Sequence, residues 1–217
     1  MAKPAVRTSS VPNRVEVALR RALIDLGADS GLDGVTASDL VRRAGIGRTT
    51  FYRHHDGIGS YVESLRGQLL GELREAFRSA QREAGRESGL YPILTLRINA
   101  ILVVIEHHAD LLRLLCRGAD GVAFRRRCRL LLSELLADDF EVLGARIDAA
   151  YCPPEYLLAF LSHAFIGAVT AWLAKSRREP IEDMTFYLAA LMSGSTAEFL
   201  EEHRGGESPR SDGPPPR

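Results

Sequence analysis

The sequence of 217 residues is poor in cysteine, in tryptophan and in net charge. Its three cysteines, Cys116, Cys128 and Cys152, are an odd number, and none of them forms a C-x-x-C pair. Such cysteines provide neither a disulfide framework nor the ligand spacing of a zinc site. We therefore expect no disulfide, no metal and no cofactor, as suits a protein of a reducing cytosol.

The chain also lacks a secretion signal and a catalytic constellation. Its first ten residues, MAKPAVRTSS, contain no apolar core of a signal peptide. No Ser/His/Asp set, pair of carboxylates or phosphate-binding loop stands at a spacing that catalysis could use. We expect a cytoplasmic protein that is not an enzyme. A cavity with a convergent acid and base would revive the alternative of an all-helical enzyme.

The longest uncharged run, residues 156–174, is long enough to cross a membrane. However, Ser162 and His163 lie at its centre, its small residues fall on one side, and an amphipathic segment follows it. These features favour a helix buried in a protein core, and we expect no membrane association.

Net charge is zero, which argues against a protein that coats nucleic acid without specificity. The charge is nevertheless unevenly distributed. Residues 1–56 hold nine Lys/Arg and six Asp/Glu, a net charge of +3, so the remainder of the chain carries −3. This asymmetry has the sign expected for an N-terminal DNA-binding domain.

Residues 35–55, VTASDLVRRAGIGRTTFYRHH, have the pattern of two short helices joined by a tight turn. Thr36 is placed to cap the first helix, with an acid three residues later as in a capping box. Gly45 follows the apolar face of that helix, where a left-handed C-terminal residue is wanted. Phe51 would anchor the second helix. This layout is that of a helix-turn-helix, although a plain helical hairpin has the same outline.

The outward face of the second helix carries side chains suited to reading DNA. Arginine forks onto the edge of guanine, and threonine offers a hydroxyl and a methyl group. For base contacts we expect Arg48 and Thr49, then Gly47 and Tyr52. For phosphate contacts we expect Thr36, Ser38, Thr50, Tyr52, Arg53 and His54. The alternatives are that Thr36 serves only as a cap and that Arg53 is only a solvated surface residue.

The run from Thr36 through Ala44-Gly45-Ile46 to Thr50-Phe51-Tyr52-Arg53-His54-His55 resembles the N-terminal domain of TetR/AcrR-type transcriptional regulators. The resemblance covers roughly the first quarter of the chain, and it implies DNA contacts by Thr36, Tyr52 and His54. The chain departs from the family pattern at two positions. His55 replaces an aromatic or apolar residue, and Ile58 stands where the family often has a lysine that meets a phosphate. Both departures bear on the grip of this region on the DNA backbone.

Apolar residues at helical spacing predict an all-α fold of about nine helices. We expect a flexible arm over residues 1–11, a three-helix DNA-binding domain over 12–56, a helical regulatory and dimerisation domain over 57–203, and a disordered tail over 204–217. Outside the helix-turn-helix, the pattern predicts helices over residues 12–28, 58–86, 92–107, 110–117, 122–147, 155–176 and 181–202, with a break at 118–121.

The last two predicted helices are more apolar than a small monomer needs. The first has a strip of small residues flanked by large ones, which allows close approach of another helix. We predict that the pair forms a four-helix bundle with the same pair of a second chain, and the TetR family dimerises in this way. The predicted interface residues are Phe160, Ala164, Gly167, Ala168, Ala171, Trp172, Leu188, Leu191 and Phe199.

A small apolar effector is expected in the C-terminal region. The candidate pocket residues are Leu102, His107, Leu112, Cys116, Phe124, Cys128 and Phe165, each of which has a plain core or surface role as its alternative. The basic run at residues 125–129 is interpreted as a solvated face, with DNA contact as the alternative.

The sequence therefore predicts a DNA-binding transcriptional regulator. We expect it to act as a repressor, as a homodimer on a near-palindromic double-stranded operator, and to be released by a small ligand. The alternative is a TetR-like co-activator or regulator whose C-terminal domain binds a protein partner. An exposed apolar groove would favour that alternative, whereas a closed cavity would favour a ligand.

Overall fold

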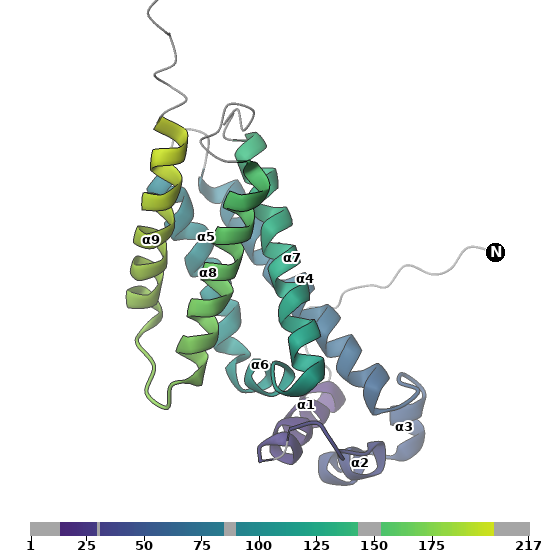
Figure 1. Ribbon diagram of the computed structural model, residues 1–217. Helices are drawn as coiled ribbons and strands as arrows, with labels where there is room; N and C mark the ends of the chain where they lie inside the picture. Colours follow the sequence, from purple (N-terminus) through teal and green to yellow (C-terminus); the bar gives the residue numbers. More distant parts are fainter. Residues whose placement is uncertain (1–13, 30, 85–89, 143–152, 202–217) are drawn as a thin grey trace, which may run out of the picture. The chain divides into compact units, whose positions relative to one another are not determined.

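The computed structural model describes residues 14–29, 31–84, 90–142 and 153–201. Regular structure in these residues is entirely α-helical, as predicted, and Figure 1 shows the helices in chain order. Their bounds are α1 (Arg14–Gly27), α2 (Ala37–Ala44), α3 (Arg48–Tyr52), α4 (Ile58–Ala84), α5 (Leu90–His107), α6 (Ala109–Leu115), α7 (Gly118–Val142), α8 (Pro154–Ala174) and α9 (Ile181–Glu201). The predicted arm over residues 1–11 and tail over 204–217 lie outside the described residues.

The chain divides into two compact units. Unit 1 comprises Met1–Gly71 and His107–Arg126, and unit 2 comprises Glu72–Glu106 and Arg127–Arg217. Unit 1 contains α1, α2, α3 and α6, and unit 2 contains α8 and α9. The helices α4 and α7 each contribute to both units, so the unit boundaries fall inside helices.

The predicted break over residues 118–121 was wrong, because α7 begins at Gly118. The backbone N–H of Gly121 donates a hydrogen bond to the Arg117 carbonyl, so the chain is helical there. A Cβ atom at Gly121 would lie 2.3 Å from the backbone of Cys116. The glycine therefore permits a close approach to the end of α6 and does not mark a loop.

The core of unit 1 joins the N-terminal helices to the start of α4. Leu19 and Leu23 of α1, Leu40 of α2 and Phe51 of α3 are buried at 2% exposure or less. The stripe predicted for the long fourth helix is confirmed as buried, since Tyr61, Leu65, Leu69, Leu73 and Phe77 all lie inside. The apolar residues of these helices recur at intervals of three and four, which puts them on one face of each helix.

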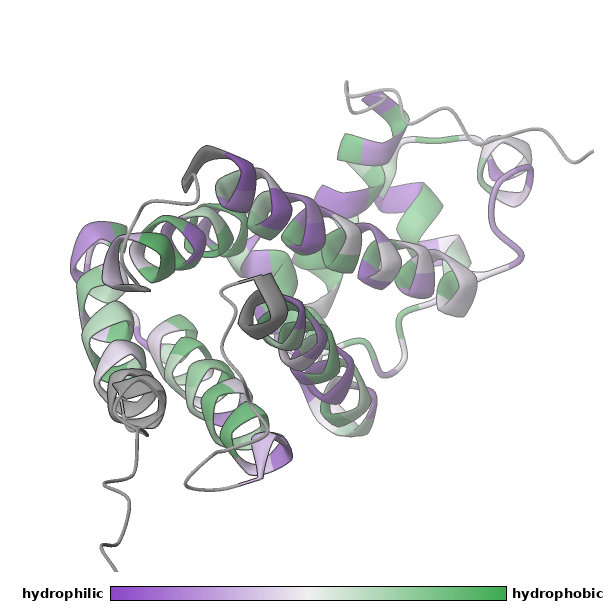
Figure 2. Ribbon diagram, turned by 90° about the horizontal axis from the view of Figure 1, so that it is seen from above, coloured by the Kyte–Doolittle hydropathy of each residue, from purple (hydrophilic) through white to green (hydrophobic). Residues whose placement is uncertain are grey.

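In unit 2, α8 and α9 run side by side and are hydrophobic over much of their length (Figures 1 and 2). By length and composition alone α8 could cross a membrane, and it is the one helix of the described residues of which this is true. Core helices of soluble proteins pass the same test. Leu157, Leu161, Phe165, Val169 and Trp172 are buried within the unit, so one face of α8 packs as a core helix.

Candidate nucleic-acid interface

The turn between α2 and α3 is fixed by hydrogen bonds to the last turn of α2. Gly45 has φ +68°, the left-handed conformation that favours glycine. Its N–H donates to the Arg42 carbonyl, and the N–H of Ile46 donates to the Val41 carbonyl. This pair of bonds is a Schellman motif, which ends α2 and turns the chain toward α3. The prediction that Gly45 ends the first helix of the pair in a left-handed conformation is confirmed.

The first turn of α2 is held by Thr36 and Asp39. The backbone N–H of Asp39 donates to the Thr36 hydroxyl oxygen at 3.1 Å, and the hydroxyl donates to the Asp39 carboxylate at 2.7 Å. This second bond lowers the pKa of Asp39 below its ordinary value. Thr36 therefore caps α2, as the sequence analysis predicted. Because its proton is already engaged, donation to a DNA phosphate would require the Asp39 carboxylate to give up this bond.

We expect Thr36→Ala to lower the free energy of unfolding by about 1 kcal/mol, because the Asp39 N–H loses its side-chain acceptor. Chemical denaturation followed by circular dichroism measures the change. Ser38→Ala is the matched control. Ser38 is an exposed residue in the first turn of α2, so this substitution removes a hydroxyl group without removing the cap. Equal losses for the two variants would contradict the capping role.

The short helix α3 separates a buried side chain from exposed ones. Phe51 is 1% exposed, whereas Tyr52 is 52% exposed. Arg48, Thr49, Arg53 and His54 are also exposed, Thr50 is half-buried, and the preceding Gly47 is exposed. The structure thus brings the predicted base-reading and phosphate-contacting residues of α3 to the surface of one short segment.

The arginines around this segment differ in their partners. Arg42 pairs with Asp39 and Arg43 pairs with Asp25, each at 2.7 Å. Arg53 donates to His54 at 3.3 Å. Among the described residues, no ion pair is formed by Arg48. Its exposed guanidinium at the start of α3 is therefore available to an anionic or hydrogen-bonding partner.

A cluster of three rings, one of them from α3 itself, holds this helix in place. The ring centroid of Phe51 lies 5.4 Å from that of His55 and 6.0 Å from that of Tyr61, and His55 and Tyr61 are 4.9 Å apart. The Tyr61 hydroxyl donates to Glu16 of α1 at 3.3 Å, and burial raises the pKa of Tyr61. His55 thus occupies a ring-packing position, which explains how the chain accommodates this departure from the family pattern. The sequence analysis did not identify Glu16 or Tyr61 as supports of α3.

Burial lowers the pKa of His55 below its ordinary value of 6.5, outweighing the opposing charges of Glu16 and Asp56. Below about pH 6.5 the unfolded chain binds a proton that folded His55 resists, so stability is expected to fall as the pH drops below that value. His55→Phe should reduce the difference in melting temperature between pH 7.5 and pH 5. Thermal unfolding at both pH values provides the measurement, with the exposed His54→Gln as control. An unchanged pH difference in His55→Phe would show that another group is responsible.

The predicted effector residues are divided between the units. Leu112 and Phe124 are buried in unit 1, where Cys116 is half-buried and His107 is exposed. Leu102, Cys128 and Phe165 belong to unit 2, with the two apolar side chains buried. Neither unit therefore brings all seven residues together. Neither Cys116 nor Cys128 forms a disulfide among the described residues, burial raises the pKa of Cys116, and Cys152 lies outside the described residues.

The predicted dimer residues also differ in exposure. Phe160 and Leu191 are 58% and 68% exposed, and the small residues Ala164, Gly167 and Ala171 are exposed as well, with Ala168 half-buried. By contrast, Trp172 and Leu188 are buried within the protomer, which corrects their placement on the interface. Phe199 has a side chain outside the described set. The sequence analysis missed Tyr156, Phe186 and Tyr187, which are large, apolar and exposed on the same two helices.

The core role of Trp172 has a clear physical basis. Its indole N–H donates to the Glu179 carbonyl at 3.0 Å. The guanidinium of Arg178 lies 5.3 Å from the centre of the indole ring and pairs with Glu106 at 2.9 Å. These contacts close the turn between α8 and α9 over the ring.

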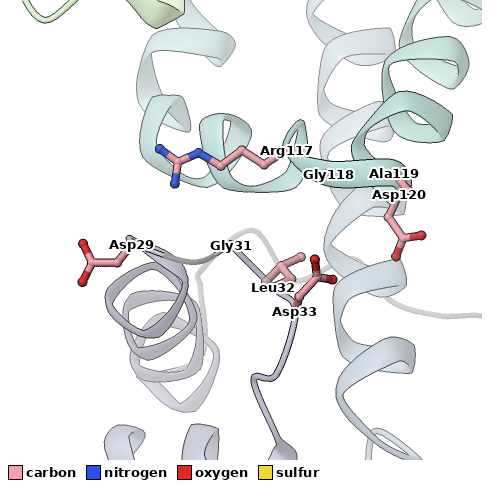
Figure 3. Close-up of a pocket in the computed structure, with 8 residues that line it drawn as sticks. All are labelled: Asp29, Gly31, Leu32, Asp33, Arg117, Gly118, Ala119 and Asp120. Carbon is pink, nitrogen blue, oxygen red and sulfur yellow. The ribbon is translucent and has the colours of Figure 1, made fainter.

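A pocket of about 380 Å³ lies in unit 1, between the loop after α1 and the start of α7 (Figure 3). The loop contributes Asp29, Gly31, Leu32 and Asp33, and the other wall is Arg117, Gly118, Ala119 and Asp120. The Arg117 guanidinium donates to the Ala28 carbonyl at 2.7 Å. None of the residues predicted to contact DNA or an effector lines this pocket. No cluster of metal-ligating side chains occurs in the described part of the chain.

An exposed helix carrying arginine, threonine and tyrosine, joined through a capped turn to a preceding helix, is the arrangement of a helix-turn-helix. The other elements of the described residues are also α-helices. The fold and this interface therefore define an all-helical protein with an N-terminal helix-turn-helix, the arrangement of a DNA-binding domain.

Comparison with known proteins finds one family model that matches part of the chain. Residues 95–194 match the family model TetR_C_8, described as a transcriptional regulator C-terminal region. None of the curated proteins matches the chain. Together with the helix-turn-helix and the all-helical fold, this match over nearly half of the chain supports a TetR-type transcriptional regulator. Regulators of this family are DNA-binding proteins and in general are not enzymes.

Solved structures share the fold. A TetR transcriptional regulator from Streptococcus agalactiae has a TM-score of 0.55 and 22% identity over 82% of this chain and 93% of its own. The fatty acid degradation regulator FadR from Bacillus halodurans has a TM-score of 0.63 and 17% identity over 83% and 97%. A putative TetR-family regulator from Syntrophomonas wolfei has a TM-score of 0.63 and 14% identity over 84% and 95%. Since these identities are low, the likeness concerns the fold alone.

Proposed function

We propose that this regulator is a cytoplasmic repressor that binds a near-palindromic operator as a homodimer and is released by a small ligand. The observation that carries the DNA-binding part is the exposed guanidinium of Arg48 on α3, which forms no ion pair among the described residues while Phe51 fixes the helix from behind. Residues 12–56 would be the DNA-binding domain, and residues 57–203 the regulatory and dimerisation domain.

In this proposal Arg48 and Thr49 read base edges, assisted by Gly47 and Tyr52. The flanking residues Thr36, Ser38, Thr50, Arg53 and His54 contact phosphates and set the register of α3 in the major groove. One such helix reads only a few base pairs, and a good bidentate contact contributes about 1–3 kcal/mol. Specific binding therefore needs two DNA-binding domains, one from each chain of a dimer.

The exposed apolar face of α8 and α9 supports the dimer. Phe160, Phe186, Tyr187 and Leu191 are each about half exposed or more, and the exposed small residues of α8 would let a second pair of helices approach. Exposed aromatic and aliphatic side chains on neighbouring helices are typical of a surface that another chain covers. A second copy of this chain supplies a matching surface by two-fold symmetry.

A route from the effector to the DNA-binding helices is suggested by contacts within unit 1. Arg20 of α1 donates to the Nδ1 of His108, the residue before α6, at 3.1 Å. Arg117, just after α6, donates to the Ala28 carbonyl just after α1. A ligand that displaces α6 would therefore displace α1 as well. Ligand and operator would then oppose each other through a shared free energy of coupling.

The test is selection of operator DNA from a random double-stranded pool by the purified full-length protein at a stated salt concentration. We expect enrichment of a near-palindrome with two half-sites about one helical turn apart. Failure to enrich any sequence at moderate salt would contradict the proposal. It would favour the alternative in which the C-terminal region binds a protein partner, and a search for that partner would follow.

A further inference from the structure

The side chain of Arg66 in α4 is a buried cation with unused donors. The residue is 9% exposed, and its Nε and Nη2 atoms are shielded from solvent and have no hydrogen-bond partner in the described part of the chain. Its nearest ion-pair partner is Glu63, whose carboxylate lies 3.7 Å from Nη1 and is half exposed. At this distance the pair is loose, and it involves the opposite edge of the guanidinium.

A second cation lies in the same part of unit 1. Arg125 of α7 is half-buried, and its guanidinium donates to the backbone carbonyl of Cys116. The positive charges of both Arg125 and Arg66 act on the Cys116 thiol. The Arg66 guanidinium also lies 5.7 Å from the centre of the Phe124 ring, which is 1% exposed. Arg125 thus contacts Cys116, and Arg66 contacts the Phe124 ring one residue before Arg125 in α7.

A buried guanidinium with unpaired donors is energetically unfavourable. Burying a charge without hydrogen-bond partners is costly, and buried charges in folded proteins are normally paired. Glu63 is the one carboxylate paired with either arginine among the described residues. The local excess of positive charge is therefore left without a full counter-charge.

The geometry of the unused atoms indicates what would satisfy them. Nε and Nη2 lie along one edge of the guanidinium plane, and this edge donates two parallel hydrogen bonds to a carboxylate. The neighbouring Phe124 ring offers an apolar surface to the remainder of such a ligand. We propose that Arg66, supported by Arg125, binds the carboxylate of an organic acid whose apolar part packs against Phe124.

This inference rests on the proposed function, since it gives a chemical class to the effector expected there. The proposed site includes Cys116 and Phe124, two of the residues predicted for the effector pocket. It also includes Arg66 and Arg125, which the sequence analysis did not predict. The effector is then an aromatic or aliphatic carboxylic acid in its ionised form, and not a neutral apolar molecule.

The experiment measures binding to the purified full-length protein without DNA, by calorimetry at constant ionic strength. The probes are benzoate and octanoate, each compared with its uncharged amide, benzamide or octanamide. We expect at least one carboxylate to bind at least tenfold more tightly than its amide. Arg66→Gln should weaken that binding at least tenfold, and Arg78→Gln, which removes an exposed arginine from the same helix, should change it less than twofold.

Three outcomes would overturn the proposal. The first is that neither carboxylate binds wild-type protein more tightly than its amide, a comparison that needs no variant to fold. The second is unchanged carboxylate binding in a folded Arg66→Gln variant. The third is binding of phenyl phosphate at least tenfold more tightly than benzoate with the same dependence on Arg66, which would assign the site to phosphate esters.

Failure of this inference is distinguishable from failure of the proposed function. Operator selection uses no acid, and acid binding uses no DNA. A protein that selects a palindrome but ignores carboxylates would retain its proposed function and lose this inference. A protein that binds benzoate through Arg66 but selects no DNA would retain this inference and lose its proposed function.

Discussion

Replacing Arg48 with alanine is expected to weaken binding to the selected operator by about 30-fold to about 20,000-fold. One bidentate contact of arginine to guanine contributes about 1–3 kcal/mol, and a dimer on a palindrome makes that contact twice. The total of about 2–6 kcal/mol gives the stated range, since about 1.4 kcal/mol corresponds to a factor of ten. The exposed position of Arg48 means that the fold should be unaffected.

Fluorescence anisotropy with the operator and with a scrambled duplex of equal length measures this effect. Arg78→Ala is the control, because it removes the same charge from an exposed position in unit 2. If Arg48 reads a base, its loss should lower affinity for the operator far more than for the scrambled duplex. An equal loss on both duplexes would show that Arg48 contacts only phosphate.

Introducing glutamate at Leu191 is expected to convert the proposed dimer to monomer, raising its dissociation constant by about 100-fold or more. Leu191 is 68% exposed on α9, on the face where we propose that a second copy packs. In a two-fold symmetric interface each substitution occurs twice, so two uncompensated charges would be buried. The free energy of unfolding of the protomer should change little, because the side chain is on its surface.

Sedimentation velocity over a range of protein concentrations gives the dissociation constant directly. Val103→Glu is the matched control, since Val103 is 50% exposed on α5 of the same unit. Loss of operator affinity in Leu191→Glu, together with an unchanged melting temperature, would connect dimer formation to DNA reading. A Leu191→Glu protein that remains dimeric would place the interface elsewhere.

The helix-turn-helix could be predicted in detail because its signals are local. A cap at Thr36, a glycine at Gly45 and an apolar anchor at Phe51 act within a few residues of where they stand. Each of these positions has the predicted geometry or burial in the structure. Gly121 was misjudged for the opposite reason, because the close backbone of Cys116 requires a glycine there and the sequence pattern does not show that contact.

Positions that depend on contacts between distant segments were harder to predict. Both α8 and α9 are apolar on more than one side, so helical spacing does not tell which side faces the core. This explains why Trp172 and Leu188 were assigned to the dimer interface although they are buried in the protomer. Arg66 was not identified at all, because an arginine in an amphipathic helix is ordinarily on the surface.

The packing of α3 has a consequence for how operator preference can change. A five-residue helix is too short to be stable alone, and here its order depends on the rings of Phe51, His55 and Tyr61. Arg48 and Thr49 take no part in that ring packing, whereas the ring of Tyr52 lies 5.4 Å from that of Phe51. Substitutions at Arg48 or Thr49 can therefore alter the preferred base sequence at little cost to folding. This separation allows operator preference to evolve. Duplicated copies of such a gene could come to recognise new operators through changes at one or two exposed residues while keeping the same fold.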